Sequence, residues 1–142
     1  MSKLARAQGD DFPEAASKHL NDAGVLLGSG QADGAAYLSG YVVECSLKSI
    51  IQLETGAPPQ AIHGLVELVS QVLAVAATAG SKTARYLGPA TRSISAASIR
   101  AWHPAMRYRA PFMAMGDAQA WHQEAAAVYQ EVIAQMRLNG EV

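Results

Sequence analysis

The segment from residue 31 to residue 54 restricts the fold more than any other part of the chain. It predicts a helix that is apolar on almost every side, because between residues 34 and 53 the only charged side chains are Glu44 and Lys48, four positions apart. A helix of this kind is stable only where other helices surround it. The segment therefore predicts the central helix of a bundle.

Helical patterns with a period of three to four residues recur on both sides of this segment. Asp11 and Glu14 form a capping-box-like pair at the start of a helix over 11–28. A turn at Gly-Ala-Pro-Pro, residues 56–59, separates the central helix from a helix over 64–79. Two short helices are expected between 81 and 102, then an irregular connection from Trp102, and a last helix over 117–138 with Asp117 as its N-cap.

No stretch alternates apolar and polar residues over a useful length, so no strand is predicted. A chain of 142 residues has the size of one ordinary domain. We expect an all-α protein, an antiparallel up-and-down bundle of four or five helices, in a single domain spanning residues 1–142.

Composition excludes several classes of protein. Cys45 is the only cysteine, which rules out an internal disulfide, and no set of Cys and His has zinc-ligand spacing, so we expect neither a metal nor a cofactor. The amino end lacks the apolar core of a signal peptide. The longest apolar stretch, 64–80, contains Glu67 and is too short to span a bilayer. We expect a soluble cytoplasmic protein that has no membrane contact.

Charge is distributed unevenly along the chain although its net value is only −1. Residues 1–67 hold eight acids and four bases, residues 117–142 hold four acids and one base, and residues 68–116 hold six bases and no acid. We call residues 68–116 the basic segment; its bases are Lys82, Arg85, Arg92, Arg100, Arg107 and Arg109. Aromatic residues interleave with these basic residues. This pattern favours a surface that binds the phosphates of a nucleic acid and stacks on its nucleobases.

A structural role for the same arginines is the alternative. Segments of opposite charge often pack together, so the arginines can instead pair with Glu44, Glu124 or Glu131 across the bundle. For Glu44 and Lys48 we expect a structural polar network, and the specific hypothesis is that Glu44 bonds to Arg107 or Tyr108.

Other candidate residues carry weaker signals. His63 is expected at a helix start, bonded locally, while His103 and His122 are the better candidates for a proton-transfer role. Trp102 and Trp121 are expected in the core or in a dimer contact, and Cys45 as a small buried apolar residue.

Three pieces of the sequence resemble HEPN-domain proteins. The run 36–51, with its Glu-Cys-x-Leu-Lys at 44–48, resembles the family's second helix. His-Gly-Leu-Val-Glu-Leu at 63–68 is similar to the start of the family's third helix, and Trp-His-Pro-x-x-Arg-Tyr at 102–108 to its tryptophan-to-Arg-Tyr segment. The resemblance implies a bundle of four or five helices, frequent homodimerisation, and company with a minimal nucleotidyltransferase in toxin–antitoxin pairs.

Many members of this family are metal-independent ribonucleases, with an arginine followed four to six residues later by a histidine. In such a pair the arginine holds the scissile phosphate and the imidazole moves a proton. After Arg107 the positions four to six residues on are Pro, Phe and Met, and Arg100 precedes His103 by only three residues. The resemblance therefore implies a variant without the nuclease pair.

We expect a HEPN-like binding and interaction module in a nucleotide- or RNA-related setting, without strong catalysis. The expected ligand-binding residues are Arg100, Arg107, Arg109, Trp102, Tyr108, Glu44 and Lys48. One alternative is an RNA-cleaving toxin in which Arg107 or Arg109 binds phosphate and His103 or His122 moves the proton. Another is a structural helper whose basic face holds an acidic partner protein.

Overall fold

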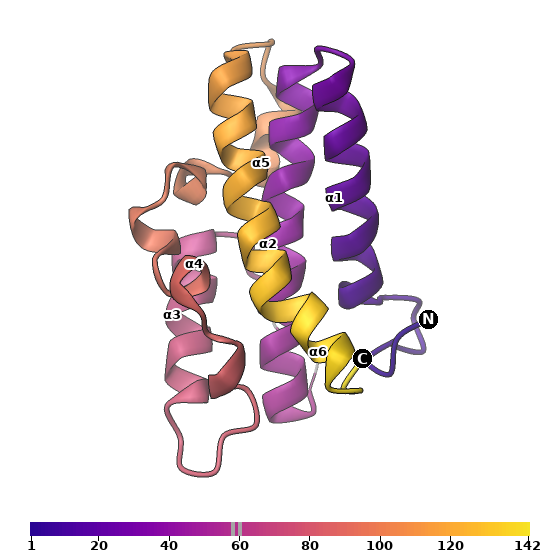
Figure 1. The fold of residues 1–142 in the computed structure, drawn as a ribbon, viewed down its shortest axis with the longest axis vertical. Coiled ribbons are helices and arrows are strands. Elements are labelled where there is room, and N and C mark those ends of the chain that lie inside the picture. Colours follow the sequence, from indigo (N-terminus) through magenta and orange to yellow (C-terminus); the bar gives the residue numbers. More distant parts are fainter. Residues whose placement is uncertain (58, 60) are drawn as a thin grey trace.

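A computed structural model describes residues 1–57, 59 and 61–142 of the chain, and every described element is helical (Figure 1). The long helices are α1 (Phe12–Gly28), α2 (Ala32–Thr55), α3 (Leu65–Ala76) and α5 (Met115–Tyr129). A π-helical turn, η5 (Gln130–Ala134), continues α5 into α6 (Gln135–Leu138). The all-α bundle predicted from the sequence is confirmed.

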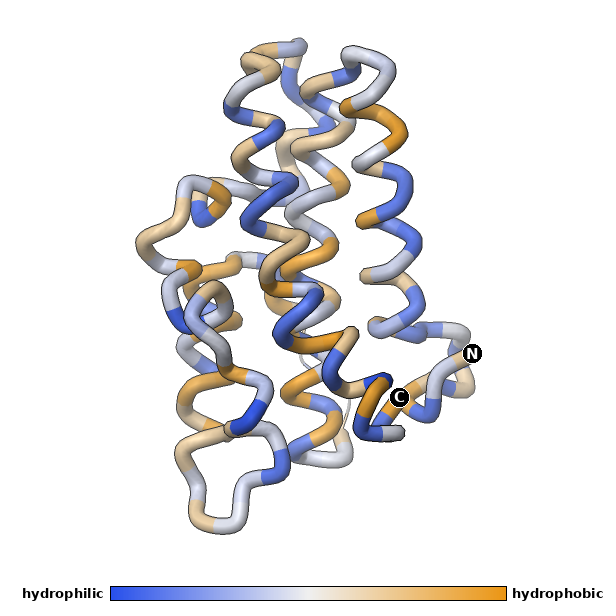
Figure 2. The backbone as a smooth tube through the Cα atoms, viewed as in Figure 1, coloured by the Kyte–Doolittle hydropathy of each residue, from blue (hydrophilic) through white to orange (hydrophobic). Residues whose placement is uncertain are grey.

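The central position of α2 is also confirmed. Its buried residues lie on nearly every side of the helix and include the polar side chains of Ser39, Ser46 and Ser49, whose hydroxyls donate to carbonyls one turn back. The helices α1, α3 and α5 all pack against it. Figure 2 shows hydrophilic residues along the outer side of α1, which faces away from the bundle.

Helix boundaries agree closely with the sequence patterns where a cap is local. Asp11 is the N-cap of α1 and accepts from the amide of Glu14, as the capping pair predicts. The chain leaves α2 at Gly56, which has a φ of 69°, while Pro58 of the predicted turn lies outside the described residues. Asp117 is not an N-cap as predicted, because α5 begins two residues earlier and places Asp117 in its first turn.

The segment between α3 and α5 contains more helical turns than the two that were predicted. They are η1 (Ala84–Tyr86), α4 (Pro89–Arg92), η2 (Ile94–Ala96), η3 (Ser98–Ala101) and η4 (Pro104–Tyr108). These short elements carry the chain back along the bundle, so α5 begins at the same end as α2 and runs in the same direction (Figure 1). The predicted up-and-down order therefore does not hold for this pair, because the return is made by short turns and not by a long helix. Asp33 at the start of α2 accepts from the amide of Phe112 just before α5, which fixes this return.

No helix among the described residues is long and apolar enough to cross a membrane. No group of three or more His, Cys, Asp or Glu side chains is arranged to hold a metal ion in residues 1–57, 59 and 61–142.

Candidate functional site

Trp102 ties the end of the basic segment to the central helix. Its ring is 2% exposed, and its indole nitrogen donates to the carbonyl oxygen of Tyr37 at 2.8 Å. The ring lies so close to Gly40 that a Cβ there would stand 2.1 Å from three of its atoms. Glycine at position 40 is therefore what allows the indole to lie flat against α2.

Two residues after this anchor, η4 begins. His103 is its N-cap, since Nδ1 accepts from the amide of Ala105 at 3.2 Å. Met106 points into the core and is 7% exposed, which leaves Arg107 and Tyr108 on the outer side of the turn. One short element thus holds a histidine, an arginine and a tyrosine near the surface.

The arginines of this region lie over aromatic rings. The guanidinium carbon of Arg107 is 5.0 Å from the centre of the Tyr108 ring, and that of Arg109 is 5.8 Å from the centre of the Phe112 ring. Tyr108 is 80% exposed and Phe112 is 53% exposed. We call Arg107, Tyr108, Arg109 and Phe112 the arginine–aromatic cluster.

The cluster borders a hollow of about 290 Å³ that also contains Asp33 and Tyr37. The carboxylate of Asp33 forms no ion pair with an arginine there, and its Oδ1 accepts from the amides of Phe112 and Met113, at 2.9 and 3.2 Å. The nearby phenol rings, Tyr108 first, raise the pKa of the Arg107 guanidinium, which keeps its positive charge at every ordinary pH.

All six bases of the basic segment are exposed. Arg85 pairs with Glu141 at 2.7 Å, and Nε of Arg92 donates to the carbonyl of Leu87. Arg100, Arg107 and Arg109 make no ion pair with any residue that the structure describes. The bases do not form one patch, because Arg85 lies beside the carboxyl end of the chain while Arg109 lies beside the start of α2.

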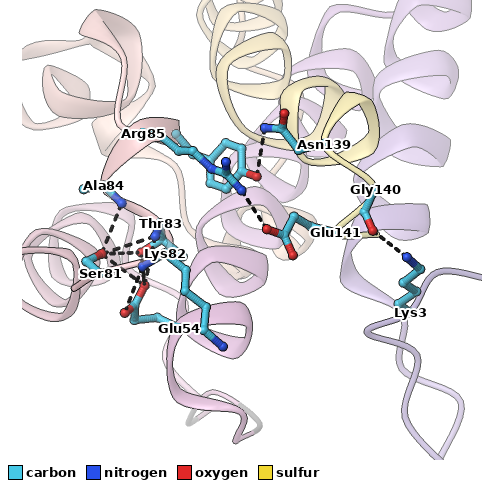
Figure 3. A network of polar contacts seen from close by, with 11 residues as sticks. Lys3, Glu54, Ser81, Lys82, Thr83, Ala84, Arg85, Asn139, Gly140 and Glu141 are labelled. Atoms are coloured by element: carbon cyan, nitrogen blue, oxygen red, sulfur yellow. Dashed lines mark hydrogen bonds and ion pairs between the residues drawn. The ribbon is translucent and has the colours of Figure 1, made fainter.

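The alternative in which these arginines pair with Glu44, Glu124 or Glu131 is wrong. Glu131 accepts from the amides of Ala90 and Thr91, and Glu124 from those of Ser98 and Ile99. In Figure 3 the carboxylate of Glu54 likewise meets the amides at the start of η1, which belong to Lys82 and Thr83. Glutamates of the long helices thus satisfy backbone amides that the short turns leave open.

Glu44 and Lys48 form a buried pair, and Glu44 is 4% exposed. The oxygen Oε1 of Glu44 lies 2.5 Å from Nζ of Lys48 and 2.9 Å from Nδ1 of His63. The predicted bond from Glu44 to Arg107 or Tyr108 is therefore wrong, as is the local bonding predicted for His63. The chain before α3 passes over the middle of α2, which brings His63 to Glu44 and leaves Arg107 on the outer side of η4.

The two candidate histidines lie in different places. His103 is exposed in the same element as Arg107, whereas His122 is half-buried and its Nε2 faces Gly24 on α1. Trp121 is 7% exposed and belongs to the core. Of the predicted site residues, the cluster therefore holds Arg107, Tyr108 and Arg109, and Trp102 anchors the start of their segment to α2. It does not include Arg100, Glu44, Lys48 or His122.

Asp33 is the residue of this region that sequence patterns did not identify. From the sequence, Asp33 is only an acid in the first turn of a helix. No local pattern indicates that it accepts from the amides of Phe112 and Met113, which are 79 and 80 residues away.

A family model described as the HEPN domain matches residues 10–135 of the chain. Comparison with curated proteins and with solved structures gave no match.

Proposed function

Since the chain belongs to the HEPN domain family, whose members have nucleotide- or RNA-related roles, we propose that it is a module that binds single-stranded RNA through the arginine–aromatic cluster. The phosphates contact Arg107 and Arg109, and unpaired bases stack on Tyr108 and Phe112. The chain acts by binding rather than by strong catalysis.

One observation carries this proposal. Arg107 and Arg109 are exposed beside two exposed aromatic rings, and neither has a carboxylate partner among the described residues. Asp33, the acid that lines the same hollow, accepts from two backbone amides and forms no ion pair with either arginine. Unneutralised guanidinium groups beside open aromatic faces are the combination that holds the phosphates and bases of a single strand.

The test is titration of a fluorescent single-stranded RNA at several salt concentrations. Arg107→Ala and Arg109→Ala should each weaken binding and reduce the slope of log K against log salt by about 0.7, the value for one lost phosphate contact. Tyr108→Ala should weaken binding with an unchanged slope, since stacking releases no counterion.

Arg137→Ala is the matched control. Arg137 is an exposed arginine on α6 that pairs with Glu14 at 2.8 Å, away from the cluster. The Arg137→Ala substitution removes the same charge as each of the other two and should leave RNA binding nearly unchanged. Equal losses in all three arginine variants would mean that net charge, and not the cluster, governs binding.

A second candidate function is metal-independent RNA cleavage. His103 is the N-cap of the element that carries Arg107, so an imidazole and a phosphate-binding group share one short turn. Cleavage of RNA in EDTA that is lost with His103→Ala and kept with His122→Ala would establish this function in place of simple binding.

The partners implied by the family belong to the same proposal. HEPN domains commonly pair with nucleotidyltransferases. We propose a homodimer that associates with a minimal nucleotidyltransferase in a toxin–antitoxin setting. Sequencing of the adjacent gene, and co-purification with its product where that is a minimal nucleotidyltransferase, tests the pairing, and light scattering tests the dimer. Capture of an acidic protein without any RNA binding would instead favour the structural-helper role.

A further inference from the structure

A groove of about 590 Å³ lies between the first turns of α1 and the middle of α2. Its lining includes two aromatic rings, a lysine, a glutamate and a cysteine: Phe12, Tyr41, Lys18, Glu44 and Cys45. It shares no lining residue with the hollow beside the arginine–aromatic cluster. What this groove binds is therefore independent of the RNA-binding proposal.

The carboxylate of Glu44 has one oxygen in use and one without a partner. Oε1 accepts from Lys48 and His63, whereas Oε2 is buried and meets no hydrogen-bond donor among the described residues. A buried carboxylate oxygen without a donor is costly, and nearly all such groups in folded proteins have a partner. This oxygen calls for a hydrogen-bond donor.

More acids than bases line the groove, and most of these acids already have partners. Four of its lining residues are acidic, Asp10, Asp11, Glu14 and Glu44, against one basic residue, Lys18. Arg6 pairs with Asp10 and Arg137 with Glu14, and Asp11 accepts from Ser2. Among these acids, Oε2 of Glu44 is the buried oxygen that meets no donor in the part of the chain that the structure describes.

Two further contacts point to the same chemistry. Nζ of Lys48 already lies 5.6 Å from the centre of the Phe12 ring, so this aromatic wall accommodates a cation. The ring of His19 packs on Tyr41 with centroids 5.4 Å apart, and Nδ1 of His19 is a second buried polar atom without a partner among the described residues. His19 does not line the groove, so Oε2 of Glu44 is the atom for which the groove lacks a donor.

We propose that this groove binds a small organic cation whose ammonium or guanidinium group donates to Oε2 of Glu44. A carboxylate accepts several hydrogen bonds at once, so the ligand donates to Oε2 while Lys48 and His63 keep Oε1. Phe12 and Tyr41 then cover the alkyl part of the ligand.

Agmatine, which has a guanidinium at one end and an ammonium at the other, is the probe. Its binding is measured by calorimetry and by amide chemical shifts of residues in the groove, against butane-1,4-diol as a neutral probe and potassium chloride at equal ionic strength. Saturable binding of agmatine, with no response to either control, is expected.

Two variants test the site by different means. Glu44→Gln combined with Lys48→Met removes both members of the buried pair together, so that no lone charge is left in the core. Ala15→Leu narrows the groove and leaves every charge in place. Each should weaken agmatine binding at least about tenfold, the effect of losing one charge-assisted hydrogen bond or the space for it. Glu67→Gln, at an exposed acid on α3, is the matched control and should change nothing.

The outcomes separate the possible sources of the donor. Agmatine binding that leaves the oligomeric state unchanged assigns a free amine, and binding that converts a dimer to a monomer assigns an arginine or lysine of a second copy of this chain. No saturable binding, or binding unchanged in Ala15→Leu, overturns the proposal. Competition by AMP at equal strength also overturns it, because the donor would then be a nucleobase amino group. RNA binding by the cluster is unaffected by any of these results.

Discussion

The contact between Gly40 and Trp102 predicts an unusual response to Gly40→Ala. In an ordinary helix this change stabilises a protein by about 1 kcal/mol, because alanine is the better helix former. Here the added Cβ would stand 2.1 Å from three atoms of a buried indole, so the ring must leave its place. Its hydrogen bond to Tyr37, at 2.8 Å, is lost with it.

The magnitude follows from two opposing contributions. Removing a large aromatic side chain from a core costs about 3–5 kcal/mol, and displacing Trp102 approaches that cost. With the helix gain of about 1 kcal/mol subtracted, Gly40→Ala should lower the free energy of unfolding by about 2–4 kcal/mol. In a Trp102→Ala background the obstacle is absent, so the same change should raise it by about 1 kcal/mol.

Urea unfolding followed by circular dichroism measures all four proteins of this double-mutant cycle. A reversal of sign between the two backgrounds is the expected result. If Gly40→Ala destabilises the chain equally with and without the indole, the close approach of Trp102 is not the reason for glycine at this position. Because Trp102 also anchors η4, Gly40→Ala should weaken RNA binding although no residue of the arginine–aromatic cluster is changed.

Three further predictions concern acids and the thiol. Glu131→Gln should lower the free energy of unfolding by about 0.5–2 kcal/mol, the usual value of a helix cap, and should speed hydrogen exchange at the amide of Thr91; unchanged exchange would contradict the capping role. Hydrogen bonds from Thr83 and its neighbours lower the pKa of Glu54 below its usual 4.5, so its stabilisation is present above that pH and is lost as the pH falls through the lowered pKa. Urea midpoints should therefore fall less between about pH 6 and about pH 3 for Glu54→Gln than for the unchanged chain, and equal falls would be evidence against this linkage. Burial raises the pKa of Cys45 to about 12, so iodoacetamide should modify its thiol only after urea unfolds the chain, and fast modification of the folded chain would refute the buried placement.

The long helices were predictable because their signals are local and repeat several times. The helix α2 is apolar on most sides over many turns, and α1 carries its own cap at Asp11. The short turns of the basic segment lack this redundancy, since an element such as η1 is too short to repeat any period. Their stability also comes from acids far away in the sequence, as with Glu131 and Thr91, 40 residues apart.

In the candidate site, too, the local contacts were predictable and the contacts between distant residues were not. The contacts of Arg107 with Tyr108 and of Arg109 with Phe112 join residues one and three positions apart, so the sequence pattern alone places each arginine beside an aromatic ring. Which acids would neutralise the arginines depends on the packing of the bundle, and the pairing predicted for Glu44 was wrong for that reason. The bond between His63 and Glu44, 19 residues apart, has no local signal either.

Glu124 and Glu131, which could have paired with arginines, accept from backbone amides instead, and the energies of the two kinds of contact explain why. A hydrogen bond to a charged group contributes about 1.5–3 kcal/mol, whereas an exposed ion pair contributes about 0–1 kcal/mol. Each short turn leaves amides open at its start, and the basic segment has no acid of its own to accept from them. Glu54, Glu124 and Glu131 therefore accept from these amides, and Asp33 accepts from the amides just before α5. The guanidinium groups of Arg107 and Arg109 stay exposed, as the proposed binding of phosphates requires. An acid introduced into the arginine–aromatic cluster, while Glu54, Glu124, Glu131 and Asp33 stay unchanged, should weaken RNA binding and leave the fold intact.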